Sequence, residues 1–234
     1  MIKSSIGCKS VMAVTGLLLS GFVLAHMLGN LQVFLGPEAY NTYAHKMQSL
    51  GPLLWVGRLG LLAILVSHVG AAMSLARENP QARPTRYVFE ATVQATYASR
   101  TMVMTGVIIL LFIVYHLLHF TIKATGAPGE GIFFTLKDGE KVVDVYSFMI
   151  LSFRVWYIVL FYILGQVVLA VHLSHGVSSM FQTFGLKSKR YAAIIDKIGP
   201  AFAFVILAGN LSMPLACFTQ ILKLPGEMSA GGML

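Results

Sequence analysis

Five long apolar stretches follow one another along this chain, separated by short polar segments rich in glycine and proline. A helix needs about 20 residues to cross the roughly 30 Å hydrocarbon core of a bilayer, and each stretch reaches that length. The pattern therefore predicts an all-α integral membrane protein, with a single membrane domain over residues 1–234. The spanning helices are expected near residues 11–35, 53–76, 101–124, 148–181 and 198–222. Because the fourth stretch is longer than a perpendicular crossing requires, we expect that helix to tilt or to protrude.

The composition agrees with a membrane protein and argues against nucleic-acid binding. Charged residues make up 11% of the 234 residues and hydrophobic residues 56%, whereas about 25% of the residues in soluble domains are charged. The formal net charge is +8, but the Lys and Arg residues lie in short segments beside the spans and form no separate basic face. In that position they indicate topology.

The distribution of Lys and Arg predicts the orientation of the chain. Ten of these residues belong to the N-terminus and to the second and fourth loops, namely Lys3, Lys9, Arg77, Arg83, Arg86, Arg100, Lys187, Lys189, Arg190 and Lys197. Five belong to the opposite side, namely Lys46, Lys123, Lys137, Lys141 and Lys223. Because cytoplasmic loops carry the excess of positive charge, we expect the N-terminus in the cytoplasm and the C-terminus outside.

Histidines occur deep within four successive spans, and two of them end the same local sequence. The first span contains TGLLLSGFVLAH, from Thr15 to His26, and the third contains TGVIILLFIVYH, from Thr105 to His116. Ionisable side chains inside a membrane are costly without a partner, so they are candidates for a functional site.

The depths of these histidines indicate two pairs. At about 1.5 Å rise per residue, His26 and His116 each lie about 22 Å from the cytoplasmic end of their helix. The second helix runs the other way, so His68 lies in the cytoplasmic half, as do His172 and His175 in the fourth helix. An outer pair (His26 with His116) and an inner pair (His68 with His172 or His175) suit two stacked haems b inside a four-helix bundle. The fifth helix is then expected outside that bundle.

Two of the helices carry a second histidine three residues after the first, on nearly the same face. The sequence shared with the first helix selects His116 over His119 as a ligand, whereas spacing alone does not separate His172 from His175. We expect one member of each neighbouring pair to be an axial ligand. The other is expected to form a hydrogen bond with a haem propionate, a quinone or the backbone.

Two further features each have two open interpretations. Thr15-Gly16 and Thr105-Gly106 lie at the depth of the inner pair, where a small residue allows close approach either of a haem edge or of a neighbouring helix. Arg58 and Arg154 lie near the outer ends of the second and fourth spans. They either pair with propionates of the outer haem or extend to the membrane interface.

Zinc binding and ion transport are the competing chemistries. No cysteine cluster or carboxylate accompanies the histidines, although zinc sites usually contain such ligands. The spans also contain no Asp or Glu, the residues expected in a proton or ion pathway.

The motifs resemble those of a known family, the five-helix dihaem cytochrome b subunits of succinate dehydrogenases and fumarate reductases. The likeness covers nearly the whole chain and is carried by TGLLLSGFVLAH, AYNTYAHKMQSLGP, SHVGAAM, TGVIILLFIVYH and HLSHGVSSMFQTFG. The family places one ligand on each of the first four helices. The matching residues here are His26, His68, His116 and His172.

The last motif separates the two histidines of the fourth helix. In the family, the fourth ligand begins a frame that has glycine four and thirteen positions later, here Gly176 and Gly185. The resemblance therefore implies that His172 is the ligand and His175 its neighbour. Some dihaem members carry a glutamate two residues before this ligand, implicated in proton transfer across the membrane. This chain has Ala170 there, which puts that route in doubt.

The resemblance implies a function in respiration and the tricarboxylic acid cycle. A flavoprotein subunit oxidises succinate, an iron–sulfur subunit carries the electrons to the cytoplasmic face, and a cytochrome b558-type chain passes them to a quinone. It further implies a multi-pass protein in the lipid of a bacterial inner membrane, with menaquinone as the expected quinone. This chain itself does not act on succinate. The alternatives are the cytochrome b subunit of a hydrogenase or formate dehydrogenase, and a non-redox transporter.

We expect a quinone site near the outer haem, where polar and aromatic residues are densest. They are Asn30, Gln32, Tyr43, His45, Lys46, Gln48, Trp55 and Arg58, with His45 as the expected proton donor or hydrogen-bond partner. A site beside the iron–sulfur subunit and an ordinary interfacial belt are the alternatives.

We expect the iron–sulfur subunit to cover residues Arg77–Arg100 and Lys187–Lys197. The alternative is that these charges only set the topology and contact lipid headgroups.

Overall fold

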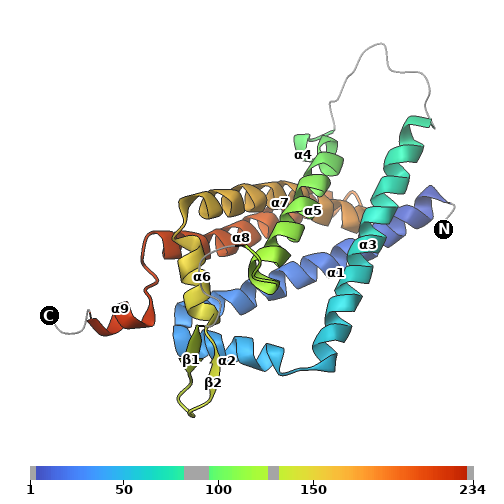
Figure 1. Cartoon of the computed structure of the whole chain (residues 1–234). Helices are drawn as coiled ribbons and strands as arrows, with labels where there is room; N and C mark the ends of the chain where they lie inside the picture. The colour runs from blue at the N-terminus through green and yellow to red at the C-terminus, as the bar shows by residue number, and fades with distance from the viewer. Residues whose placement is uncertain (1–3, 82–94, 126–131, 231–234) are drawn as a thin grey trace. The chain divides into compact units, whose positions relative to one another are not determined.

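The computed structural model describes residues 4–81, 95–125 and 132–230, and these are almost entirely helical (Figure 1). Among the described residues, five helices are long and apolar enough to cross a membrane, which confirms the predicted fold class. They comprise Ser5–Leu35, Pro52–Glu78, Met102–Thr121, Trp156–Thr183 and Ala192–Phe218. Apolar side chains such as Leu59 and Phe204 are exposed on these helices, as expected of surfaces that contact lipid.

The spanning segments consist of the following elements. The first is α1 (Ser5–Asn30) continued by a 3-10 turn, η1 (Leu31–Leu35), and the second is α3 (Pro52–Gln81). The third is α5 (Met102–His116) continued by a π-helical turn, η2 (Leu117–Thr121), and preceded by the short α4 (Tyr97–Arg100). The fourth is α7 (Trp156–Thr183) and the fifth is α8 (Ala192–Phe218).

The expected fourth span is two helices instead of one, because α6 (Val145–Phe153) is separate from α7. The start of α6 is fixed by Asp144, whose Oδ1 accepts hydrogen bonds from the backbone N–H of Ser147 at 2.9 Å and from Nδ2 of Asn41 at 3.0 Å. Nearly all of α6 is buried. It therefore packs within the protein, and the prediction of one continuous helix over residues 148–181 was wrong.

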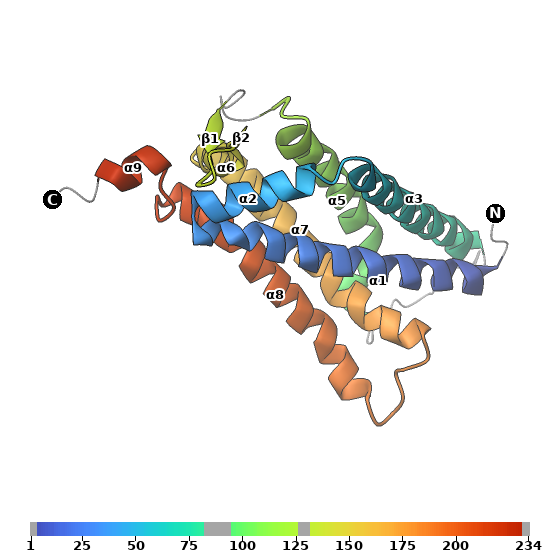
Figure 2. The same ribbon diagram turned by 90° about the horizontal axis from the view of Figure 1, so that it is seen from below.

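Further elements outside the spans are not predicted by the hydrophobic pattern. They are α2 (Pro37–Gln48), a two-stranded antiparallel hairpin of β1 (Phe133–Thr135) and β2 (Lys141–Val143), and α9 (Pro225–Ala230). Pro37 begins α2 at the position where a helix tolerates proline best. In Figures 1 and 2, α2 folds back beside the end of α1, where the Tyr40 hydroxyl donates a hydrogen bond to Oδ1 of Asn30 at 2.8 Å.

The last span begins earlier than expected, at Ala192, so Pro200 lies inside α8. Beside Pro200, α8 packs closely on α7. The backbone N–H of Gly199 donates to the Ser178 hydroxyl at 3.1 Å, and that hydroxyl donates to the carbonyl of Ile195 at 3.0 Å. A Cβ at Gly199 would overlap the carbonyl of Ser174. Small residues commonly permit this approach between membrane helices.

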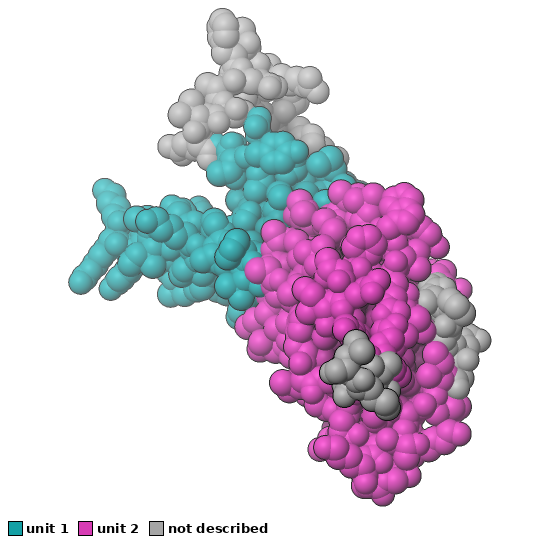
Figure 3. All heavy atoms as spheres, turned by 90° about the vertical axis from the view of Figure 1, so that its left-hand side faces the viewer, with its two compact units in different colours: residues 1–23, 57–110, 168–205 teal, residues 24–56, 111–167, 206–234 magenta. Residues whose placement is uncertain are grey.

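The residues form two compact units, coloured separately in Figure 3. Unit 1 comprises Met1–Val23, Gly57–Leu110 and Val168–Val205, and unit 2 comprises Leu24–Val56, Leu111–Val167 and Ile206–Leu234. Unit 2 contains the larger apolar core, which includes Tyr146, Ile150 and Cys217. Unit 1 contains a small cluster of Cys8, Ala71 and Leu75. Each unit holds one of the two predicted histidine pairs: His68 and His172 belong to unit 1, and His26 and His116 to unit 2.

Candidate functional site

In unit 1, each Thr-Gly motif contacts a histidine from the next spanning helix. Oγ1 of Thr15 in α1 lies 3.0 Å from Nδ1 of His68 in α3. Oγ1 of Thr105 in α5 likewise lies 3.0 Å from Nδ1 of His172 in α7. The motif that occurs in both the first and the third span therefore makes the same threonine–histidine contact in each.

These contacts indicate which histidine nitrogen carries the proton. The hydroxyl of Thr15 donates to the carbonyl of Val11 at 2.7 Å, and that of Thr105 donates to the carbonyl of Thr101 at 3.0 Å. A hydroxyl has a single proton, so if that proton goes to the carbonyl, each threonine oxygen accepts a hydrogen bond from Nδ1–H of its histidine. A neutral imidazole protonated on Nδ1 presents an unprotonated Nε2, which is the form that binds a metal.

The glycines of the two motifs lie against the same histidine rings. A Cβ at Gly16 would lie 3.5 Å from Cε1 of His68, and one at Gly106 would lie 3.6 Å from Cε1 of His172. Both are ordinary van der Waals distances. Within the described part of the chain, no backbone atom of another helix lies within 4 Å of either added Cβ. Each glycine thus lies against a histidine side chain of the neighbouring helix, which does not decide between the two interpretations. The approach of a haem edge stays a prediction.

In unit 2, the rings of His26 and His116 are in contact edge-on, with centroids 5.7 Å apart and planes at 85°. Two metal–nitrogen bonds of about 2 Å each would separate the centroids of two axial imidazoles by roughly 6 Å. The separation therefore fits axial ligation, and crossed ring planes are compatible with it because each ring binds through one nitrogen.

The four predicted ligands differ in exposure from the neighbouring His119. His26 is exposed and His68, His116 and His172 are half-buried, whereas His119 is fully buried. Among residues 4–81, 95–125 and 132–230, no group of three or more His, Cys, Asp or Glu side chains could hold a metal ion. Donors arranged in twos suit a planar cofactor that supplies four ligands of its own, and they do not suit a closed zinc site with four protein ligands.

Tyr162 contacts two of the candidate histidines, and the sequence does not reveal it. Its hydroxyl lies 2.9 Å from Nδ1 of His119 and 3.4 Å from Nδ1 of His116. The only signal in the sequence is the presence of a tyrosine in an apolar span, since a buried tyrosine hydroxyl usually has a hydrogen-bond partner. This signal does not single out Tyr162, because α7 also contains Tyr157, whose side chain is exposed.

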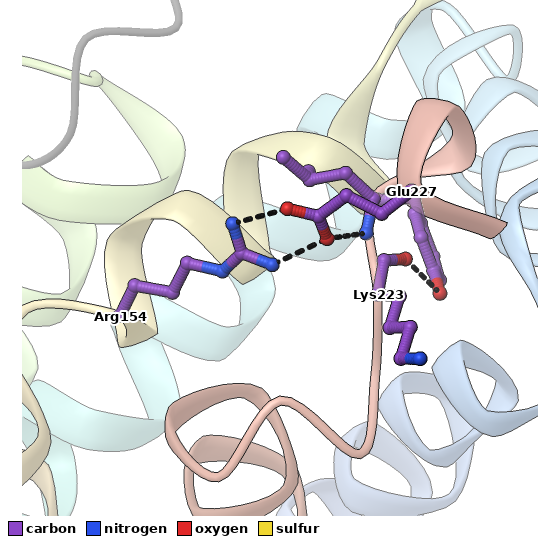
Figure 4. A network of polar contacts seen from close by, with 5 residues as sticks. Arg154, Lys223 and Glu227 are labelled. Atoms are coloured by element: carbon purple, nitrogen blue, oxygen red, sulfur yellow. Dashed lines mark hydrogen bonds and ion pairs between the residues drawn. The ribbon is translucent and has the colours of Figure 1, made fainter. Parts of the chain in front are cut away.

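Arg154, a predicted partner of haem propionates, is engaged elsewhere. Its Nη1 and Nη2 bond both carboxylate oxygens of Glu227 in α9, at 2.9 and 2.6 Å (Figure 4). The same carboxylate accepts the backbone N–H of Leu224 at 2.9 Å. Together, the Arg154 guanidinium and this N–H lower the pKa of Glu227 to about 2. The second predicted arginine, Arg58, lies in unit 1 and not in the unit that holds the outer pair.

Most of the predicted quinone group belongs to one unit. Asn30, Gln32, Tyr43, His45, Lys46, Gln48 and Trp55 belong to unit 2, whereas Arg58 does not. Both polar atoms of the Asn30 side chain already have hydrogen-bond partners. Nδ2 donates to the carbonyl of His26 at 2.8 Å, and Oδ1 accepts from the Tyr40 hydroxyl. Nε2 of His45 lies 3.2 Å from a carboxylate oxygen of Glu140 in the turn between β1 and β2. The quinone site itself stays a prediction.

No protein-family model, no curated protein and no solved structure matches this chain. The likeness of its motifs to dihaem cytochrome b subunits therefore stays a prediction. The structure shows in addition which residues contact the candidate histidines, and these contacts bear on whether the histidines can bind a metal.

Proposed function

We propose that this chain is the membrane-anchor cytochrome b subunit of a succinate:quinone oxidoreductase. In this role it relays electrons between an iron–sulfur subunit and a membrane quinone through two haems b. The observation that carries the proposal is the pair of contacts Thr15–His68 and Thr105–His172, each 3.0 Å between Oγ1 and Nδ1. They suit two histidines protonated on Nδ1 with Nε2 available to a metal, which a merely structural intramembrane histidine does not require.

The proposed axial ligands are His68 and His172 for the inner haem and His26 and His116 for the outer haem. When bound, haem supplies one-electron transfer in each site. The protein holds the imidazoles at the two sites, and the partners at Nδ1 of His68, His172 and His116 orient these three rings. His172 is preferred over His175 because the Thr105 hydroxyl contacts His172.

The proposed orientation places the N-terminus in the cytoplasm of a bacterium and the C-terminus outside. The iron–sulfur subunit then docks on the cytoplasmic loops, whose Arg83 and Arg86 lie outside the described residues. Between α7 and α8, Nζ of Lys187 is already paired with Asp196 at 2.6 Å, whereas Lys189 and Arg190 are exposed. We therefore assign Lys189 and Arg190 the larger share of any contact with the partner.

Purification of the complex under mild conditions tests the proposal. A flavoprotein and an iron–sulfur protein should copurify with the chain, and the preparation should transfer electrons between succinate and a quinone. A nickel or molybdenum subunit in their place would identify a hydrogenase or formate dehydrogenase. A preparation whose dithionite-reduced spectrum has no b-type band would favour the transporter and contradict the proposal.

A further inference from the structure

The predicted outer ligand His116 has a partner of a different kind from the threonines of unit 1. The hydroxyl oxygen of Tyr162 in α7 lies 3.4 Å from Nδ1 of His116 and 2.9 Å from Nδ1 of His119. All three side chains belong to unit 2. Because a tyrosine hydroxyl has one proton, it donates to one of these histidines and accepts from the other.

Metal binding by His116 allows only one of the two assignments. If Tyr162 donated to His116, the proton of that imidazole would be on Nε2, which would block Nε2 as a ligand. If Tyr162 donates to His119, His116 donates its own Nδ1–H and keeps Nε2 unprotonated. In this second assignment the hydroxyl donates in the shorter of its two contacts, the one with His119. His119 then carries its proton on Nε2.

The surroundings of His119 are those of a built site. Its side chain is 0% exposed, and the rings of Tyr115, Phe120, Phe148 and Phe153 lie around it. Its Nε2 is buried and has no hydrogen-bond partner among the described residues. Buried polar groups without a partner are rare in folded proteins and call for an explanation beyond packing.

The backbone around His119 is also unusual. The helix changes from α to π directly after His116, and the N–H of Ile122 bonds to the carbonyl of Leu117, five residues earlier, at 2.9 Å. Single π-helical turns are rare and occur frequently at functional sites. This turn determines where His119 lies relative to His116 and Tyr162.

We propose that Tyr162 and His119 are positioning residues for His116. The hydrogen bonds from His116 to Tyr162 and from Tyr162 to His119 hold the proton of His116 on Nδ1 and orient its ring. An acceptor at Nδ1–H makes an imidazole a stronger electron donor, which stabilises oxidised iron and lowers the reduction potential. The inference rests on the proposed function, since it requires His116 to be an axial ligand.

A redox titration of the haem spectrum of the purified complex tests the inference. Tyr162→Phe removes the hydroxyl and keeps the ring. It should retain both haems, shift the midpoint potential of the outer haem upward and leave the inner one unchanged. The outer haem is identified as the redox wave that is lost in His26→Ala. The matched control is Tyr115→Phe, which removes the hydroxyl of a ring beside His119 and should shift neither wave.

A second pair of variants separates positioning from packing. His119→Leu removes the acceptor for the Tyr162 hydroxyl and should also shift the outer wave upward. His119→Asn offers a side-chain oxygen in place of Nδ1 and should restore most of the original potential. An unshifted outer wave in Tyr162→Phe overturns the inference. If that variant loses the outer haem, equal potentials in His119→Leu and His119→Asn overturn it instead. A wild-type complex without two haem waves contradicts the proposed function itself, so the two failures are distinguishable.

Discussion

Nδ1 of His172 lies 3.0 Å from the hydroxyl oxygen of Thr105, and that hydroxyl donates its only proton to a carbonyl of its own helix. The threonine is therefore an acceptor, and the histidine presents an unprotonated Nε2. Thr15 and His68 repeat the relationship. Two such histidines in unit 1 are the main physical support for the proposal that this chain binds haem.

Removal of the threonine hydroxyls should weaken the inner haem. Thr105→Val keeps the shape of the side chain but leaves Nδ1–H of His172 without its acceptor. We expect affinity for the inner haem to fall about 10- to 100-fold, as for other partners of metal-binding histidines. The measurement is haem retention during dilution of the purified complex. Thr105→Ser, which keeps a hydroxyl, is the matched control, and equal retention in both variants would contradict the role of the hydrogen bond.

The glycine variants decide whether a haem edge approaches α1 and α5. A methyl group at Gly16 or Gly106 meets only the histidine ring at an ordinary distance, so the protein alone tolerates it. If a haem edge lies there, Gly106→Ala should lower the inner haem content while the chain folds and inserts normally. Unchanged haem content would show that the edge does not approach this backbone. Gly70→Ala, where nothing lies within 4 Å of the added Cβ, is the control.

The sequence predicts the spans better than it predicts their connections. Long apolar stretches specify spanning helices directly, and Thr15 and Thr105 are conspicuous because their motif occurs twice. The break between α6 and α7 was missed because residues 148–181 are mostly apolar, with Arg154 as the one Lys, Arg, Asp or Glu residue, and the capping of α6 depends on Asn41, distant in sequence from Asp144. Tyr162 was missed because its role depends on two histidines of another helix.

His45 tests the location of the quinone site. If it supplies a proton or a hydrogen bond to the quinone, His45→Ala should lower quinone reduction by roughly 100-fold, the lower range for loss of a general acid. Succinate oxidation by an artificial dye and the haem content should be unchanged. Glu140→Gln removes the carboxylate that lies 3.2 Å from His45 and should give a smaller effect in the same direction. Normal quinone kinetics in His45→Ala would place the site elsewhere.

The ion pair of Arg154 and Glu227 should resist acid. The pKa of Glu227 is lowered from 4.5 to about 2, so its contribution is present above pH 4.5 and is lost only as the pH falls through about 2. A ¹³C NMR titration of the glutamate carboxyls should therefore include one group with a pKa near 2. In Arg154→Ala, that pKa should rise toward 4.5. Titration of Glu227 near 4.5 in the unaltered protein would show that the pair does not form.

The haem content of the purified chain tests the central claim most directly. Acid-acetone should extract all the haem, since no covalent attachment motif is present in the sequence, and the pyridine haemochrome should give two haems b per chain. His26→Ala or His116→Ala should remove one haem, His68→Ala or His172→Ala the other, and His175→Ala neither. Two haems per chain with this pattern of losses is the predicted result. A ratio of one haem or none per chain would contradict the account.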